Sequence, residues 1–400
     1  MVSKLRSMGF VSTLCLMVYL SMFFDNGYAQ DSTRLVPAII TFGDSVVDVG
    51  NNDYLPSTIF KANYPPYGRD FANKSPTGRF CNGKLATDFT AETLGFTTYP
   101  PAYLSPQASG KNLLIGTNFA SAGSGYYDQT AINSHVISLS QQLQYYKEYQ
   151  RKLVQVAGNA KAASIIKDAL YIVSFGASDF VQNYYVNPLL NGAYTPDQFS
   201  SFLVSIFTNF IKNLHGLGAR RIGATSLPPT GCLPAAITLF GLGNNGCVSR
   251  LNTDAQGFNK KINAAATQLK KQFPDLKLAI FDIYKPLLDV VQSPSKYGTD
   301  ATILLSSPYI TACITLFSAL LLSPRSVVKY IFLDTGFFEA RRGCCGTGTV
   351  ETTVYLCNPR SPGTCSNATQ YIFWDSVHPS EATNQVLADA LILEGISLIG

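Results

Sequence analysis

The sequence predicts an α/β fold built on a central parallel sheet of about five strands. Short apolar runs of strand length alternate with longer segments of helical periodicity. Several of these runs end at glycine-containing clusters of small or polar residues, which mark the start of a loop. Strand–helix alternation is typical of parallel strands joined by right-handed crossovers. The expected strands cover residues 36–42, 113–119, 170–175, 221–226 and 276–281.

The first expected strand, residues 36–42, is apolar and rich in β-branched residues, as buried strands are. Gly43 ends it, so Ser45 lies just past its carboxyl end, the edge where open α/β sheets bind ligands. A loop rich in Pro, Gly and Tyr covers residues 64–80, and a helix is expected at 82–94, with Asn82 as its N-cap. The second strand leads into the small residues 120–125, where backbone N–H groups can approach a ligand.

The later elements continue the alternation. A polar helix is expected at residues 137–156, and the third strand ends at residues 176–179. A capped helix begins at Thr195 and Pro196 and reaches Leu217, and another covers residues 251–273 between the fourth and fifth strands. The last helix, residues 382–396, follows Pro379, a residue that suits a first helical turn.

Three residues far apart in the sequence have the side chains of a nucleophilic site. A serine nucleophile needs a base, and the base needs an orienting group. Asp375 and His378 are close enough in sequence for the carboxylate to hold one imidazole nitrogen of His378, and Ser45 lies on the turn after the first strand. Taken alone, Gly-Asp-Ser is more often a plain turn, and a lone histidine is more often structural. The other two histidines, His135 and His215, fit structural positions.

The chain resembles the plant-type GDSL esterases/lipases of the SGNH hydrolase superfamily. Six stretches in the order typical of the family carry the resemblance, and together they cover about residues 36–298 and 337–400. The resemblance implies a three-layer α/β/α, SGNH hydrolase-like fold in a single domain over residues 30–400. The stretches are FGDSVVDVGNN (42–52), NFASAGSG (118–125), SFGASD (174–179), LPPTGC (227–232), RGCCG (342–346) and DSVH (375–378).

The resemblance implies a secreted serine esterase or lipase that hydrolyses carboxylic esters through an acyl-enzyme. Ser45 would be the nucleophile, His378 the general base and Asp375 its orienting group. The oxyanion hole would use the backbone N–H groups of Ser45 and Gly125, with Gly123 as the near alternative. Ser178 stands where the family usually has asparagine, so we expect a working but weaker donor there.

Other functions share these residues. Acyl transfer to an alcohol uses the same triad, and a secreted binding protein with weakened catalysis fits the change at Ser178. Tyrosines 64, 67, 184 and 185 could then line a sugar groove, although such residues more often only pack. No cofactor or metal is expected, because no His/Cys/carboxylate ligand set is apparent. Asp44 and Asp48 fit structural turn and cap positions, and Asp179 fits a residue that orders its loop.

The N-terminus indicates secretion. Lys4 and Arg6 precede an apolar run at residues 8–24, and Ala29 ends a small-residue cleavage pattern, so residues 1–29 are expected to be a signal peptide. The protein would act in the apoplast or cell wall on a small-molecule, lipid or polymer ester. Glycosylation sequons begin at Asn73 and Asn367. The net charge is only +5 and the basic residues are scattered, which argues against nucleic acid as a partner.

Disulfides are expected in such a chain. Of nine cysteines, Cys15 belongs to the signal peptide. Cys232 and Cys247 flank a Gly/Asn-rich loop, and Cys357 and Cys365 flank a Pro/Gly-rich loop, so we expect these two pairs. The sequence leaves the connectivity of the rest open. The remaining cysteines are Cys81, Cys313, Cys344 and Cys345.

An insertion interrupts the family pattern at about residues 299–336. Its residues 302–322 carry no charge and are long enough to cross a bilayer. A single crossing would separate Ser45 from His378, so no stable membrane span is expected. The segment could be an apolar surface hairpin, a membrane- or substrate-binding lid, or a translated intron.

Overall fold

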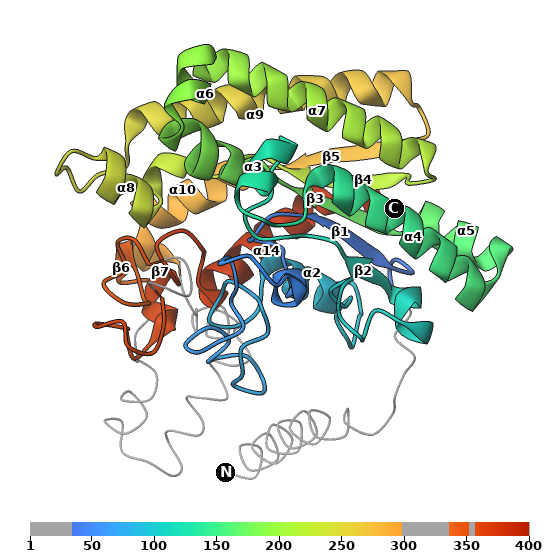
Figure 1. The fold of residues 1–400 in the computed structure, drawn as a ribbon, viewed down its shortest axis with the longest axis horizontal. Coiled ribbons are helices and arrows are strands. Elements are labelled where there is room, and N and C mark those ends of the chain that lie inside the picture. Colours follow the sequence, from blue (N-terminus) through green and yellow to red (C-terminus); the bar gives the residue numbers. More distant parts are fainter. Residues whose placement is uncertain (1–33, 298–335, 352–356, 400) are drawn as a thin grey trace, which may run out of the picture. The chain divides into compact units, whose positions relative to one another are not determined.

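The computed structural model describes residues 34–297, 336–351 and 357–399. A five-stranded sheet forms its centre, with the order β2-β1-β3-β4-β5 and every neighbouring pair parallel (Figure 1). The predicted fold class and the number of strands are therefore confirmed. The strands are β1 (Ile39–Gly43), β2 (Gly116–Asn118), β3 (Leu170–Ser174), β4 (Arg221–Thr225) and β5 (Lys277–Phe281).

Helices cover both faces of the sheet, which gives the three layers that the resemblance implied (Figure 1). Side chains alternate between the faces along each strand. In β3, Tyr171 and Val173 pack in the cluster that includes helices α4, α7 and α9. Leu170 and Ile172 pack in the cluster with α2 and α14. These helices are α2 (Ala86–Thr93), α4 (Leu139–Ala157), α7 (Pro196–Gly216), α9 (Ser249–Gln272) and α14 (Glu381–Ile399).

Smaller elements connect these layers. A second sheet pairs β6 (Glu339–Gly343) with β7 (Tyr371–Phe373) in parallel and lies just before the segment that holds Asp375 and His378. The sequence did not predict these two strands, because β6 is largely polar and β7 has only three residues. The other α-helices described are α3 (Asp128–Asn133), α5 (Asn159–Asp168), α6 (Pro188–Ala193), α8 (Pro234–Phe240) and α10 (Tyr284–Gln292).

Two predicted boundaries were wrong. The 3₁₀ helix η2 (Gly110–Ile115) occupies the start of the expected second strand, so β2 has only three residues. Gly116 joins the two with a φ of +97°, and a Cβ there would lie 1.8 Å from the Ile39 carbonyl oxygen. The first helix begins at Ala86 because Asn82 has other partners. Its amide donates to Asp70 at 2.8 Å, and its oxygen accepts the Glu381 N–H at 2.9 Å.

The expected Cys357–Cys365 pair was wrong, whereas the Cys232–Cys247 pair is confirmed. Cys365 bonds to Cys344, and Cys357 bonds to Cys345. The Cys344 and Cys345 N–H groups donate to the carbonyls of residues 373 and 374, so both cysteines lie beside the end of β7. Each of these two adjacent cysteines therefore forms a disulfide with one of the later cysteines, Cys357 or Cys365. Among the described residues Cys81 is a free, buried thiol, whose pKa burial raises.

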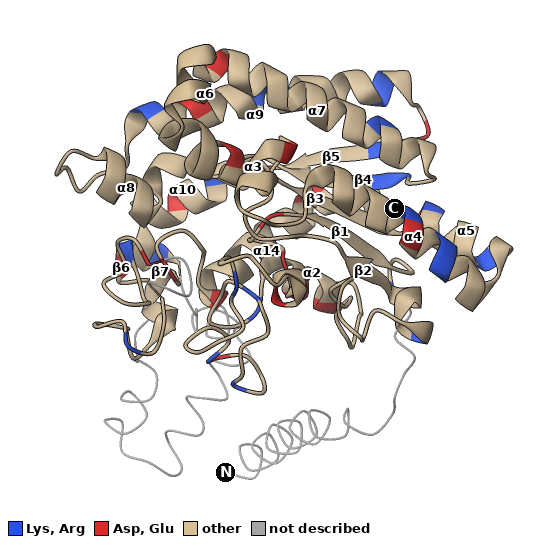
Figure 2. Cartoon of the chain, viewed as in Figure 1, with Lys and Arg blue, Asp and Glu red and all other residues tan. Residues whose placement is uncertain are grey.

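Most of the expected insertion and the expected signal peptide lie outside the described residues. The described chain on either side of the insertion is closely joined. The Phe337 N–H donates to the Tyr297 carbonyl at 2.8 Å and to the Pro294 carbonyl at 3.1 Å. Within the described residues, α14 is long and apolar enough to cross a membrane by length and composition. Acidic and basic residues intersperse over the helical layers (Figure 2).

Candidate active site

The turn that carries Ser45 is fixed by the neighbouring strand β3 and by α4. Gln142 of α4 accepts the Gly43 N–H at 3.0 Å and donates to the Gly43 carbonyl at 2.9 Å. The Asp44 N–H donates to the Ser174 carbonyl at the end of β3. A Cβ on residue 43 would lie 2.6 Å from that same carbonyl oxygen, so only glycine fits there. The turn therefore presents Ser45 at a fixed position past the end of β1.

The structure brings Ser45, His378 and Asp375 into one hydrogen-bonded row. The Ser45 Oγ lies 2.7 Å from His378 Nε2, although the two residues are 333 positions apart. His378 Nδ1 lies 2.7 Å from Asp375 Oδ2, and a carboxylate in this position holds the proton on Nδ1. Nε2 is then free to accept the serine proton. All three side chains are nearly buried, with exposed fractions of 6%, 4% and 0%.

Backbone and tyrosine donors hold the Asp375 carboxylate. Its Oδ1 accepts the N–H groups of Val377 at 2.9 Å and His378 at 2.7 Å. Its Oδ2 accepts the Tyr67 hydroxyl at 2.8 Å. Burial and the neighbouring Asp375 raise the pKa of Tyr67, so it stays a hydroxyl that can donate. The sequence offered no signal for this contact, because Tyr67 lies in an irregular loop 308 positions from its partner.

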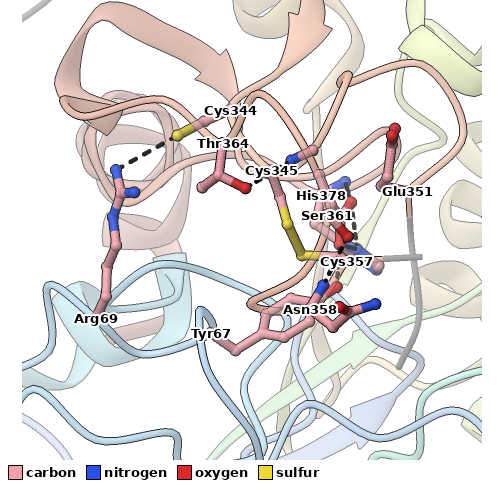
Figure 3. Close-up of a disulfide and its surroundings, with 12 residues drawn as sticks. Tyr67, Arg69, Cys344, Cys345, Glu351, Cys357, Asn358, Ser361, Thr364 and His378 are labelled. Atoms are coloured by element: carbon pink, nitrogen blue, oxygen red, sulfur yellow. Dashed lines mark hydrogen bonds and ion pairs between the residues drawn. A yellow bond between two sulfur atoms is a disulfide. The ribbon is translucent and has the colours of Figure 1, made fainter. Parts of the chain in front are cut away.

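The disulfide-linked loop 343–365 supports the segment with Asp375 and His378 from the other side. The Cys345 N–H donates to the Trp374 carbonyl, and the Ser376 N–H donates to the Glu351 carbonyl. Figure 3 shows the Cys345–Cys357 disulfide near Tyr67 and His378, with Arg69 reaching toward Cys344. The Arg69 guanidinium also lies 4.8 Å from the centre of the Trp374 ring. Residues on both sides of Asp375 are thus fixed.

Two of the expected oxyanion donors, Gly125 and Ser178, lie in the segments after β2 and β3. Because β1 lies between these strands, the two loops flank the turn that carries Ser45. A Cβ on Gly125 would lie 2.1 Å from Asp179 Oδ1, which explains the glycine. Asp179 accepts the Tyr126 N–H at 2.7 Å and the Thr130 hydroxyl at 2.7 Å, so it orders this loop. Ser178 immediately precedes it and is 4% exposed.

Asp44 is a buried acid next to Ser45. Its Oδ1 accepts the Val46 N–H at 3.3 Å, and its Oδ2 has no hydrogen-bond partner among the described residues. Burial is the main cause that raises its pKa from 3.8 to about 7. Asp48, in contrast, accepts the N–H groups of Gly50, Asn51 and Ala122 and caps the turn.

The remaining expected positions have structural contacts or are exposed. His215 Nε2 lies 2.8 Å from Asp275 Oδ1, outside the site. The sequon residues Asn73 and Asn367 are both exposed. Over the described ranges, no three His, Cys, Asp or Glu residues form a group that could hold a metal ion.

Comparisons with known proteins point to one family. The sequence model of the family described as GDSL-like Lipase/Acylhydrolase matches residues 39–391. The GDSL esterase/lipase APG of Arabidopsis thaliana is 63% identical over 92% of this chain and 93% of its own length. Two more Arabidopsis proteins, GDSL esterase/lipase At5g22810 and At5g03810, are 54% and 52% identical; these matches cover 91% and 97% of this chain, and 91% and 98% of the relatives. The chain belongs to the GDSL-like lipase/acylhydrolase family and is a carboxylic ester hydrolase.

Proposed function

We propose that this chain is a secreted serine esterase that uses Ser45, His378 and Asp375 as a catalytic triad. The observation that carries the proposal is the continuous row of contacts from the Ser45 Oγ through both imidazole nitrogens to the Asp375 carboxylate. Such a row provides a nucleophile, a base and a group that fixes the tautomer of the base.

The reaction follows from this row. His378 Nε2 takes the hydroxyl proton while the Ser45 Oγ attacks the ester carbonyl carbon. The tetrahedral intermediate then expels the alcohol, which receives that proton from His378, and leaves an acyl group on Ser45. Water attacks this acyl-enzyme after giving a proton to His378, and the acid is released as the Ser45 hydroxyl reforms. An alcohol in place of this water would give acyl transfer.

The carbonyl oxygen of the ester becomes negatively charged in each of the two tetrahedral intermediates, and hydrogen-bond donors must stabilise this charge. We assign this role to the backbone N–H groups of Ser45 and Gly125, supplemented by the Ser178 hydroxyl. The segments that hold Gly125 and Ser178 follow the strands on either side of β1, which supports the assignment. A serine hydroxyl is shorter than an asparagine amide and rotates freely, so it would stabilise the oxyanion less.

Secretion fits the covalent structure. The part of the chain that the structure describes contains three disulfides, which persist in oxidising compartments. Two of them support the loop next to Asp375, so the site depends on such a compartment. Cleavage after Ala29 and glycans on the exposed Asn73 and Asn367 would follow from export.

The test is hydrolysis of p-nitrophenyl butyrate by the secreted protein and its Ser45→Ala variant. We expect activity to fall by at least 10⁴-fold, on the order of the loss when a triad member is removed. Ser376→Ala is the matched control, because the Ser376 hydroxyl has no hydrogen-bond partner among the described residues. Activity that survives in folded Ser45→Ala would refute the assignment.

A further inference from the structure

The chain after Ser178 folds into a single turn of π-helix, η3 (Asp179–Asn183). Ser178 itself has helical dihedral angles, with φ of −63° and ψ of −36°, so it continues this turn on its N-terminal side. Turns of π-helix are rare and occur frequently at functional sites. The side chains of η3 therefore need to be placed relative to the proposed oxyanion donors.

One side of η3 faces the segment that holds Gly125. The Thr130 hydroxyl of α3 donates to Asp179 Oδ1 at 2.7 Å and accepts from Asn183 Nδ2 at 3.0 Å. Asp179 also accepts the Tyr126 N–H at 2.7 Å, and Tyr126 directly follows Gly125. Asp179 and Asn183 thus share one side of the turn, next to one proposed oxyanion donor.

Another side of η3 faces the segment that holds His378. Val181 packs against the apolar cluster that contains Phe373 of β7, and Val377 packs against the same cluster. Val377 directly precedes His378 in the chain. Phe180, in contrast, is 1% exposed and lies in the main core, away from both segments. The orientation of the turn is therefore fixed by three different sets of contacts.

Gln182 projects between the two sides that face the proposed site. Successive side chains on a helix point about 100° apart, and residues four apart lie on the same face, so Gln182 shares the face of Ser178. Helical side chains lean toward the N-terminus and cover the preceding turn. The long Gln182 side chain is therefore directed back over Ser178, between the segments of Gly125 and His378.

The Gln182 amide is not held there by its oxygen. Gln182 Oε1 is buried and has no hydrogen-bond partner among the described residues, although Gln182 as a whole is half-buried. A half-turn of the amide exchanges its oxygen with the NH₂ group, which has two donors, and costs this oxygen no hydrogen bond. A buried polar atom without a partner lowers stability, so its presence calls for another role.

We propose that the Gln182 amide donates a hydrogen bond to the carbonyl oxygen of the ester as its negative charge develops. The inference rests on the proposed function and adds a residue to that site. The serine at position 178 is short, and the longer glutamine one turn further along would provide the amide donor in its place. Gln182 makes and breaks no covalent bond in this role; it stabilises the charge of both tetrahedral intermediates.

The first test compares Gln182→Leu and Gln182→Glu with wild type on p-nitrophenyl butyrate. Loss of one oxyanion donor costs roughly 10²–10³ in kcat. We expect kcat to fall about 100-fold in Gln182→Leu while KM stays within about threefold, because the bond strengthens mainly in the transition state. Gln182→Glu should lose at least as much at pH 8, since an ionised carboxylate only accepts hydrogen bonds. Gln129→Leu is the matched control, an exposed glutamine on α3 that should keep kcat within about twofold.

The second test asks whether an amide at position 178 makes Gln182 dispensable. In the Ser178→Asn background, Gln182→Leu should lower kcat by less than about fivefold, against about 100-fold in the wild-type background. A glutamine that only maintained the local fold would lower kcat by the same factor in both backgrounds, and that result would overturn the inference.

The third measurement separates activity from stability. Gln182→Leu removes a buried oxygen that has no partner among the described residues, so its urea midpoint should equal or exceed that of wild type. If Gln182→Leu does not fold, Gln182→Glu, which has nearly the same size, decides the question. Activity that depends on Ser45 but keeps its kcat in the folded Gln182 variants would support the proposed function and refute the inference. Wild-type protein without esterase activity, or activity that survives in Ser45→Ala, would refute both.

Discussion

Asp44→Asn should stabilise the protein more at alkaline than at acidic pH. The wild-type carboxyl group is 1% exposed, and one of its oxygens has no hydrogen-bond partner among the described residues. Its pKa is about 7 in the folded protein against 3.8 ordinarily. Between these values the folded chain holds a proton that the unfolded chain has lost. Stability must therefore fall as pH rises through this interval.

The size of this change in stability follows from the difference between the folded and the ordinary pKa of Asp44. About three pKa units correspond to roughly 4 kcal/mol over the full range. Between pH 5 and 8.5 the wild-type protein should lose about 2–3 kcal/mol of this amount. Asparagine has no proton to lose, so the stability of Asp44→Asn relative to wild type should rise by the same 2–3 kcal/mol.

Urea unfolding of both proteins at pH 5 and pH 8.5 measures this difference. All other titrating groups are present in both proteins, so their contributions to the difference in stability largely cancel. Asp389→Asn is a suitable control, because Asp389 is exposed on α14 and its substitution should shift stability equally at the two pH values. The reasoning is refuted if Asp44→Asn has the same stability relative to wild type at both.

Three further changes test the site and its surroundings. Tyr67→Phe removes a buried donor to Asp375, a hydrogen bond to a charged group worth about 1.5–3 kcal/mol, so the free energy of unfolding should fall by about that amount. The acidic limb of its pH profile should also move to higher pH, because Asp375 would depend more on the imidazolium; an unmoved limb would indicate a purely structural tyrosine. Ser178→Asn should keep or raise kcat for p-nitrophenyl butyrate, and a steep loss would contradict its role as a weaker oxyanion donor. Deletion of residues 299–335 should leave the melting temperature within a few degrees, since backbone hydrogen bonds already join the flanking segments, and a protein that no longer folds would disprove this.

The sequence predicted the parts of the fold that have a local signal. The strands β1, β3 and β5 are short and mainly apolar runs, and a glycine, Gly43, ends the first of them. Ser45, Asp375 and His378 could be singled out because their side-chain types are uncommon together and match the family motifs. That the structure brings them within hydrogen-bond distance follows from the parallel order of the sheet and from the position of β7.

Other features depend on contacts that leave no pattern in the sequence. The adjacent cysteines 344 and 345 are equivalent by spacing, and only the placement of β6 beside β7 assigns them different partners. Tyr67 lies in an irregular loop, so its contact with Asp375 has no periodic signature. An apolar cavity between the sheet and α14 arises where side chains from several strands and helices do not fill the space between them, which no single segment determines.

The place of α14 in the chain bears on the order in which folding occurs. This helix follows every other described element in the sequence, so it leaves the ribosome after them. Until then, apolar side chains such as Ile172 and Phe281 lack their cover and can associate with other chains. His378, which precedes α14 directly, also arrives late, so the proposed nucleophile Ser45 is made long before its proposed base. Under the proposed mechanism a nascent chain could not yet cleave esters, and chaperones that bind exposed apolar surface should act on it mainly before α14 docks.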